Sequence, residues 1–372
     1  MFALLLACSG PPEAPAEPAS CRFLEAPAAG PLAGPRQAAG NDPLALARLF
    51  IREARQTGDA GFYTLASGAI DCALARDSAS AEARRLHAHV ALQFHDFAAV
   101  EAEAGRLVAL PGATWLDHAL LGDAQMEQGK LDAAADAYQR AADLRPALEV
   151  LDRIGWLRWL WGDMEGSLQM AQLAAGSGSP ADAEPYAWAL SRLGWLHALR
   201  GEAAPELDRA LALVPGYGPA ALARGRLRLH QGDRVGAAAD LLAVGATVEG
   251  VWALSEIEAT ASVEAVRKQD ARGYALWLAP RDPAGALALL NEEWSVRQDA
   301  TTRMGRAWAA WLGGGETAFD PSAEARTALA TGIVEPRVLR MGSQILGDDA
   351  LMQRALAMGP GLLPSERALP PR

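Results

Sequence analysis

Few side chains in this 372-residue sequence have the types and spacings that catalysis requires. The first candidates for a metal site or for acid–base chemistry are the six histidines, His87, His89, His95, His118, His197 and His230. His87 and His89, the closest two, would point to different sides of a helix, which is poor geometry for one metal ion. The carboxylates are scattered, and the sequence contains no phosphate-binding loop, HExxH, CxxC or GxSxG pattern. We therefore predict no catalytic, metal-binding or cofactor-binding residue, and no enzyme.

A binding surface is the remaining source of function, and the element that would position it is clearest at residues 115–146. This stretch, WLDHALLGDAQMEQGKLDAAADAYQRAADLRP, predicts two helices joined by a turn at Gly129, with Gly122 inside the first helix and a proline ending the second. The order of small and large residues resembles the tetratricopeptide repeat (TPR), a closely packed pair of helices. His118 and Gln125 replace the tryptophan and tyrosine of the family pattern, but the spacing is kept.

A seven-residue interval between glycines recurs in four successive units. The pairs are Gly122 and Gly129, Gly155 and Gly162, Gly194 and Gly201, and Gly225 and Gly232. The first glycine of each pair would let the second helix approach closely, and the second would adopt the left-handed conformation that ends a helix. In the unit before these, His95 and Asp96 stand where a Gly-Asp turn would be.

Comparable units cover most of the chain. We predict a TPR array at 41–247 with units near 44–80, 81–114, 115–147, 148–181, 187–217 and 218–247, degenerate helical repeats at 248–298, C-terminal repeats at 299–360 and a proline-rich, frayed tail at 361–372. Because each helix pair has an apolar face on both sides, the units must stack to bury these faces. The fold that the resemblance implies is all-α, a right-handed superhelical solenoid of about nine TPR-like helix pairs.

The resemblance also implies which side chains line a concave groove, namely positions 2, 5, 9 and 12 of each first helix. Carried onto the third to sixth units, this register gives Leu116, Ala119, Asp123, Met126, Glu149, Asp152, Trp156, Trp159, Trp188, Ser191, Trp195, Ala198, Leu222, Arg226 and Leu229. Since tryptophan and arginine most often anchor interfaces, we predict a peptide-binding groove of Met126, Asp152, Trp156, Trp159, Trp188, Trp195 and Arg226. The equally weighted alternative is that these tryptophans pack between helices, as we expect for Trp161, Trp294, Trp308 and Trp311.

The N-terminal sequence MFALLLACSG resembles the lipobox of bacterial lipoproteins. The resemblance implies a signal peptide at 1–8, cleaved before Cys8, and a diacylglycerol attached to Cys8. The apolar run is too short to span a bilayer, which needs about 20 residues. It is also shorter than the usual apolar region of a signal peptide and no Lys or Arg precedes it, two features that a wrongly assigned start codon would explain.

The stretch 9–40 is rich in proline, alanine, glycine and glutamate and lacks an apolar period, so it predicts a disordered tether. Cys21 lies inside the tether and is expected to be unpaired, whereas Cys72 is expected to be a buried thiol on a helix. A disulfide between Cys21 and Cys72, which would require an oxidising compartment, is the less favoured alternative.

The formal net charge of -11 and the pI near 5.1 argue against nucleic acid as a partner and against an anionic lipid surface. We predict a non-catalytic protein- or peptide-binding scaffold for bacterial envelope assembly, held at the periplasmic face of a membrane by its lipidated N-terminus. One alternative is a cytoplasmic TPR adaptor or regulator without a lipid. Another is an enzyme with its site in 248–294, which a buried polar cluster of Glu256, Glu258, Lys268 and Asp270 would favour.

Overall fold

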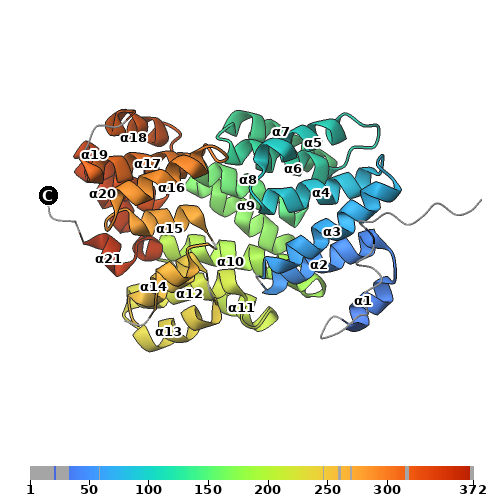
Figure 1. The fold of residues 1–372 in the computed structure, drawn as a ribbon. Coiled ribbons are helices and arrows are strands. Elements are labelled where there is room, and N and C mark those ends of the chain that lie inside the picture. Colours follow the sequence, from blue (N-terminus) through green and yellow to red (C-terminus); the bar gives the residue numbers. More distant parts are fainter. Residues whose placement is uncertain are drawn as a thin grey trace, which may run out of the picture.

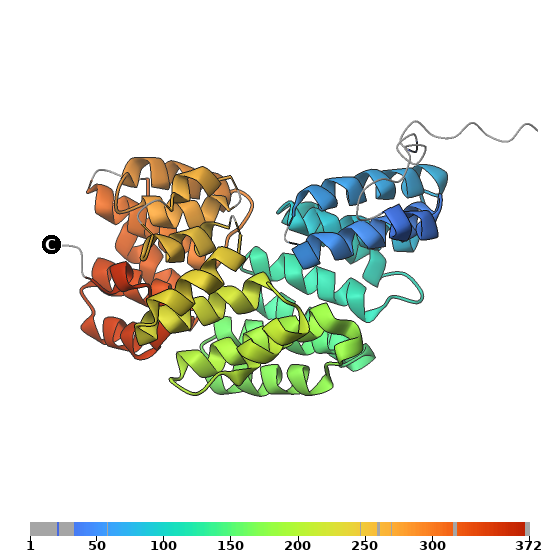
Figure 2. The same cartoon turned by 90° about the horizontal axis from the view of Figure 1, so that it is seen from below.

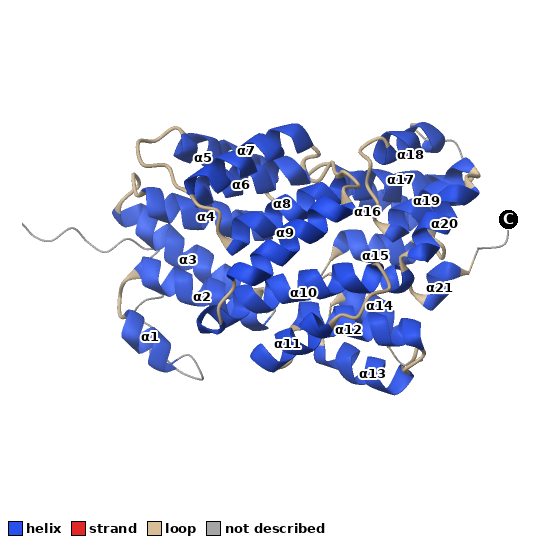
Figure 3. Ribbon diagram, turned by 180° about the vertical axis from the view of Figure 1, so that it is seen from behind, coloured by secondary structure: helices blue, strands red, loops and turns tan. Residues whose placement is uncertain are grey.

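The computed structural model describes residues 21, 33–57, 59–245, 247–258, 261–268, 270–314 and 318–368. The expected signal peptide with Cys8, most of the expected tether and the last four residues lie outside this part of the chain. Every regular element within the described ranges is helical, and these ranges contain no strand. Figure 3 shows the same helices connected by short loops.

Most helices form pairs that follow one another along the chain (Figure 1). The nine pairs in the described residues are α2 (Pro43–Thr57) with α3 (Gly61–Arg76), α4 (Ala81–Gln93) with α5 (Phe97–Val108), α6 (Trp115–Glu127) with α7 (Leu131–Leu144), α8 (Leu148–Leu160) with α9 (Met164–Ser177), α10 (Ala183–Leu199) with α11 (Pro205–Leu213), α12 (Gly218–Gln231) with α13 (Arg234–Ala243), α15 (Ala271–Leu278) with α16 (Pro283–Trp294), α17 (Ala300–Gly313) with α18 (Pro321–Leu329), and α19 (Pro336–Leu346) with α20 (Asp349–Ala357). The expected helical solenoid is therefore confirmed.

Short elements stand before, between and after these pairs. They are α1 (Ala33–Ala39), the turn η2 (Pro180–Asp182), α14 (Val248–Ser255) with the turn η3 (Val263–Val266), the turn η4 (Gly359–Gly361) and α21 (Pro364–Arg367). Helix α14 has no second α-helix of its own among the described residues, and this accounts for the weak repeat pattern around 248–270.

The glycine interval has the geometry that the sequence predicted. A methyl group on Gly122 would lie 2.5 Å from a ring carbon of Tyr138, because α7 crosses α6 at that point. Seven residues later Gly129 has a φ of +74°, in the left-handed region that ends a helix. His95 has a φ of +61° and so occupies the turn position that glycine holds in the later units.

The solenoid bends so that its C-terminal half returns to its middle (Figure 2). The backbone N–H of Gln298 donates to the carbonyl oxygen of Glu127 at 3.1 Å. At a second contact, a methyl group on Gly162 would lie 2.2 Å from the carbonyl oxygen of Gly332. The turns that follow α6 and α8 therefore pack against loops about 170 residues further along the chain.

Two expectations about the ends of the chain were wrong. Cys21 is not unpaired: it forms a disulfide with Cys72 of α3, with a Cα–Cα distance of 4.8 Å, and α1 lies within the stretch expected to be a disordered tether. The expected frayed tail is also ordered as far as residue 368, because Leu362 and Leu363 are buried.

Two of the tryptophans assigned to packing, Trp161 and Trp311, are more than one third exposed, whereas Trp308 is in the core.

Candidate binding groove

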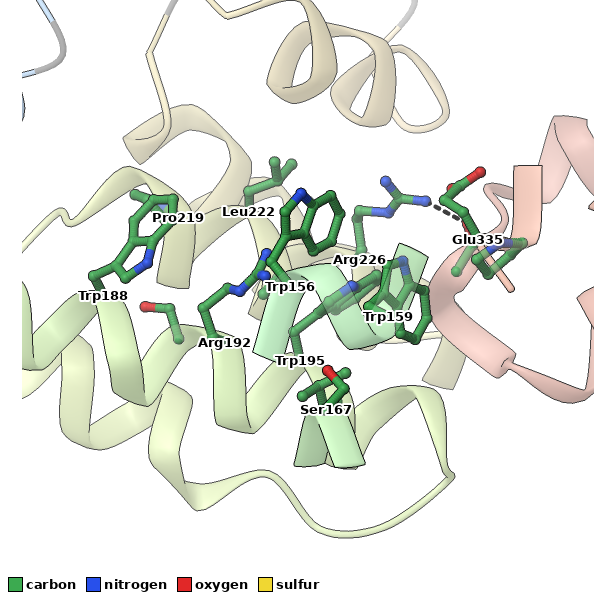
Figure 4. Close-up of a pocket in the computed structure, with 15 residues that line it drawn as sticks. Trp156, Trp159, Ser167, Trp188, Arg192, Trp195, Pro219, Leu222, Arg226 and Glu335 are labelled. Atoms are coloured by element: carbon green, nitrogen blue, oxygen red, sulfur yellow. Dashed lines mark hydrogen bonds between the residues drawn. The ribbon is translucent and has the colours of Figure 1, made fainter. Parts of the chain in front are cut away.

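Three first helices, α8, α10 and α12, lie next to one another and line a pocket of about 290 Å³ (Figure 4). Four indoles face it: Trp156 and Trp159 from α8, and Trp188 and Trp195 from α10. The opposite side is closed by the C-terminal half, through Glu335, Pro336 and Gly361. We call this site, lined also by Arg192 and Arg226, the tryptophan pocket.

Stacking holds the indoles of the tryptophan pocket in place. Trp156 and Trp159 stack with ring centroids 6.5 Å apart, and the guanidinium of Arg192 lies 4.3 Å from the ring centroid of Trp156. Arg226 lies 5.3 Å from the ring centroid of Trp195. Such cation–π contacts each contribute about 0.5–2 kcal/mol. The aromatic walls are thus fixed before any ligand arrives, which lowers the entropy cost of binding.

Asp152, the acidic residue of the predicted groove, accepts a hydrogen bond from Trp188. Trp188 Nε1 donates to Asp152 Oδ2 at 2.8 Å, and Arg192 Nε lies 3.5 Å from Asp152 Oδ1. Asp152 therefore orients Trp188 and Arg192 from behind and does not itself line the pocket.

The charged groups at the closed end of the pocket are tied to the C-terminal half. Arg226 donates from Nη2 to the Gly361 carbonyl oxygen at 2.7 Å, and its Nη1 lies 3.5 Å from Glu249. Burial lowers the pKa of Arg226. Burial would raise the pKa of Glu249, but the positive charges of Arg337 and Arg226 outweigh it and lower that pKa to about 2. Glu249 is therefore ionised at neutral pH. Burial raises the pKa of Glu335, which accepts from the Val338 N–H at 2.7 Å.

One polar group in the pocket lacks a partner. Trp159 is 3% exposed, and its Nε1 has no hydrogen-bond acceptor among the described residues. A buried N–H without a partner is unusual in folded proteins and costs free energy. Because this nitrogen is itself enclosed, the pocket offers a ligand mainly its indole faces. A cavity of this size accommodates a few side chains rather than a large cofactor.

The structure brings together five of the seven predicted groove residues: Trp156, Trp159, Trp188, Trp195 and Arg226 all line the pocket. Asp152 lies behind it, as described above. Met126 does not belong to it, because its sulfur lies 3.8 Å from the hydroxyl of Tyr138 between α6 and α7.

Four further register positions are core rather than groove, and Ala198 and Leu229, at 1% and 7% exposed, are two of them. Ala119 is fully buried, and Asp123 is 7% exposed and bonded to Tyr138 and Arg153. The lining residues that were not predicted are Arg192, the three residues contributed by the C-terminal half, and Ser167, Leu196, Pro219 and Ala223. A neighbouring tryptophan at the right helical spacing could have indicated Arg192, but no local signal indicates the C-terminal residues.

The four polar residues that would favour an enzyme do not form a buried cluster. Glu258 and Lys268 are exposed, Asp270 accepts from the Gly273 N–H at 3.0 Å to start α15, and Glu256 accepts hydrogen bonds from Ser365. No group of three or more His, Cys, Asp or Glu side chains in the described ranges could hold a metal ion. None of the helices described is both long and apolar enough to cross a bilayer.

Comparisons with known proteins give little beyond this geometry. No protein-family model and no curated protein matches the sequence. Among solved structures, the chain is similar to one described as the crystal structure of the APC/C hetero-tetramer Cut9-Hcn1, with a TM-score of 0.49 and 14% sequence identity. The match covers 90% of this chain, which spans 58% of the chain it matches.

Proposed function

We propose that this protein is a non-catalytic scaffold that binds a segment of a partner protein in the tryptophan pocket. The observation that carries the proposal is the pocket itself, which is lined by four indoles from α8 and α10 together with Arg192 and Arg226. Tryptophan and arginine in a desolvated pocket are the residue types that dominate binding energy at protein interfaces.

The contacts in the pocket favour a particular kind of segment. An apolar or aromatic side chain of the partner would fill the space between Trp156, Trp188 and Trp195. The guanidinium groups of Arg192 and Arg226 lie against indole faces, and each is paired with a carboxylate. An extended peptide with an apolar anchor fits this combination best.

We expect Trp188→Ala to weaken peptide binding about tenfold or more, because it removes one wall of the pocket. Ligands would be selected from a random peptide library on the wild-type protein and then measured by fluorescence polarisation. Trp311→Ala is a matched control, since Trp188 and Trp311 are each 37% exposed and Trp311 lies outside the pocket. The control should bind the selected peptides as the wild type does.

Two results would contradict the proposal. One is a library selection that yields no peptide with an apolar anchor. The other is equal weakening by Trp188→Ala and Trp311→Ala, which would mean that the peptides recognise exposed indoles in general.

We also propose that the chain is exported and held at the bacterial envelope through a lipid on Cys8, with a cytoplasmic adaptor as the alternative. The disulfide between Cys21 and Cys72 supports export, because disulfides persist in oxidising compartments and are rare in the cytosol. The sequence has three cysteines, and Cys8 is the one outside this disulfide. A lipid on the sulfur of Cys8 would therefore leave no free thiol.

The lipid is tested by expressing the gene with its upstream DNA and comparing the wild type with Cys8→Ser. We expect a membrane-bound species carrying the mass of a diacylglycerol in the wild type only, and a disulfide in both proteins by mass spectrometry without reduction. A wild-type protein that stays unprocessed, reduced and in the cytoplasmic fraction would support the adaptor instead.

A further inference from the structure

A second pocket, of about 380 Å³, lies in the C-terminal half and belongs to no site described above. Its floor consists of buried side chains from α14, α15, α17, α19 and α21, and its rim is exposed. The floor is made by Trp252, Leu276, Trp308, Arg337, Arg340, Met341 and Glu366, and the rim by Pro280, Arg281, Ser365 and Ala368. We call it the arginine pocket because three arginines face it.

Arg340 is the unusual residue of this pocket. It is 7% exposed, it makes no hydrogen bond or ion pair with any residue that the structure describes, and its Nε is fully enclosed without an acceptor. The face of Trp308 lies against it, with the ring centroid 5.3 Å from the guanidinium carbon, and the negative charge of Glu366 acts on it without a hydrogen bond. Burying an unpaired charge is costly, so a guanidinium in this position needs a compensating anion.

The carboxylates around the pocket are already engaged elsewhere. Glu366 accepts from Arg337 Nη2 at 3.2 Å and from the Leu363 N–H at 3.0 Å. Arg337 in turn donates to Glu249 at 2.8 Å and lies 4.2 Å from the ring centroid of Trp252. Arg337 is thus shared between Glu249 and Glu366, and neither oxygen of Glu366 bonds to Arg340.

The rim adds a second cation. Arg281 donates to the carbonyl oxygen of Trp277 and makes no ion pair among the described residues. The carboxylate that acts on it is Glu256, which accepts from the backbone N–H and the hydroxyl of Ser365. The pocket thus has an unpaired guanidinium on its floor and another at its mouth, between apolar walls.

We infer that the arginine pocket binds a small molecule with an oxyanion, a carboxylate or a phosphate, on an apolar body. The oxyanion would accept from Arg340, which offers a planar fork of donors, and Arg281 would draw it in from solvent. The apolar body would lie against Trp252, Leu276 and Trp308. This site is separate from the tryptophan pocket, and the inference does not depend on the proposed function.

Four probes test the chemistry: phenylacetate, phenyl phosphate, inorganic phosphate and the neutral phenylacetamide. Binding would be measured by calorimetry and by the shift of the thermal unfolding midpoint, on the full chain. We expect phenylacetate or phenyl phosphate to bind the wild type at least tenfold more tightly than phenylacetamide. Inorganic phosphate, which lacks the apolar body, should bind more weakly than phenyl phosphate.

The variants separate a binding arginine from a structural one. Arg340→Met keeps an unbranched apolar stem and removes the guanidinium with its charge, so we expect it to lose at least tenfold in affinity. Its unfolding midpoint without ligand should be unchanged or higher by roughly 2 °C, because replacing an uncompensated buried charge by an apolar group is stabilising. Arg340→Lys, which keeps the charge but loses the fork, should bind several-fold more weakly. Arg354→Met, at an exposed position of α20, should match the wild type.

Several results would overturn the inference. Absence of binding by both aromatic anions is one, and equal binding of phenylacetamide or of inorganic phosphate is another. Equal affinity in the wild type and Arg340→Met would show that Arg340 takes no part. A lower unfolding temperature of Arg340→Met than of the wild type would assign Arg340 a structural role. Wild-type affinity of Arg340→Lys would show that the guanidinium does not contact the ligand.

Discussion

Replacing Gly162 with alanine is expected to lower the free energy of unfolding by about 2–5 kcal/mol. Two costs add at this position. The residue has a φ of +78°, where a side chain costs about 1–2 kcal/mol. The added methyl group would also lie 2.2 Å from the Gly332 carbonyl oxygen. Because that oxygen belongs to the backbone, the overlap can be relieved only by moving the chain, and overpacking of this kind costs about 1–3 kcal/mol.

Gly201→Ala is the matched control for this substitution. Gly201 occupies the same turn in the next helix pair with a φ of +74°, and a methyl group there would meet no atom within 4 Å. Gly201→Ala should therefore cost only the conformational part, about 1–2 kcal/mol. The measurement is urea unfolding followed by circular dichroism, and equal losses for the two variants would show that the turn after α8 is not tightly packed against the C-terminal half.

The partner glycine allows a second comparison. Gly332 has a φ of +88°, and a methyl group on it would lie 2.5 Å from the Trp161 carbonyl oxygen. Gly332→Ala should thus be as destabilising as Gly162→Ala. Because both substitutions force the same two loops apart, the double variant should cost less than the sum of the single ones.

Much of the fold could be predicted because the sequence signals for each pair of helices lie within the repeat itself. The helices α4, α6, α8 and α12 begin at residues 81, 115, 148 and 218, where the predicted units begin. Local rules act at such helix starts: Ser80 caps α4 by accepting from the Ala83 N–H, and Asp163 caps α9 by accepting from the Gly166 N–H.

Contacts between remote parts of the chain could not be predicted in this way. A repeat pattern specifies which helix packs on its neighbour, whereas the contact between Gly162 and Gly332 depends on small rotations summed over several pairs. The same limit applies to the disulfide, since the composition around Cys21 favours a tether and gives no sign that Cys21 bonds to Cys72 of α3. The proline-rich end was wrongly expected to fray, because Pro360 and Pro364 lie in the first turns of short helices next to buried leucines.

The candidate groove was predictable on one side only. The family register placed Trp156, Trp195 and Arg226 at equivalent positions, and the structure gathers them in one pocket. The other side of that pocket comes from Glu335 and Gly361, more than 100 residues later. Arg226 joins the two sides by donating to the Gly361 carbonyl oxygen, so the groove that the resemblance implied is partly closed by the chain itself.

Asp123 occupies the same register position as Trp156, yet we expect Asp123→Ala to act on stability and not on binding. The Asp123 carboxylate accepts from the Tyr138 hydroxyl at 2.8 Å and from Arg153 Nε and Nη2 at 2.8 and 2.9 Å. It therefore links α6 and α7 of one pair to α8 of the next. The positive charge of Arg153 would lose its carboxylate, and breaking a buried pair by removing one partner costs about 3–5 kcal/mol.

Variants of the two partners separate the parts of this effect. Tyr138→Phe removes one hydrogen bond and should cost about 1 kcal/mol. Combining Asp123→Leu with Arg153→Met removes both charges together and should recover most of what Asp123→Ala loses, because no unpaired charge remains. The readouts are urea unfolding and affinity for peptides selected on the wild type. A near-wild-type stability of Asp123→Ala together with a loss of peptide affinity would place Asp123 in the groove and contradict the structural role. A large loss of stability with unchanged affinity in the folded protein would show that this register position is used for packing in the third pair and for recognition from the fourth pair onward.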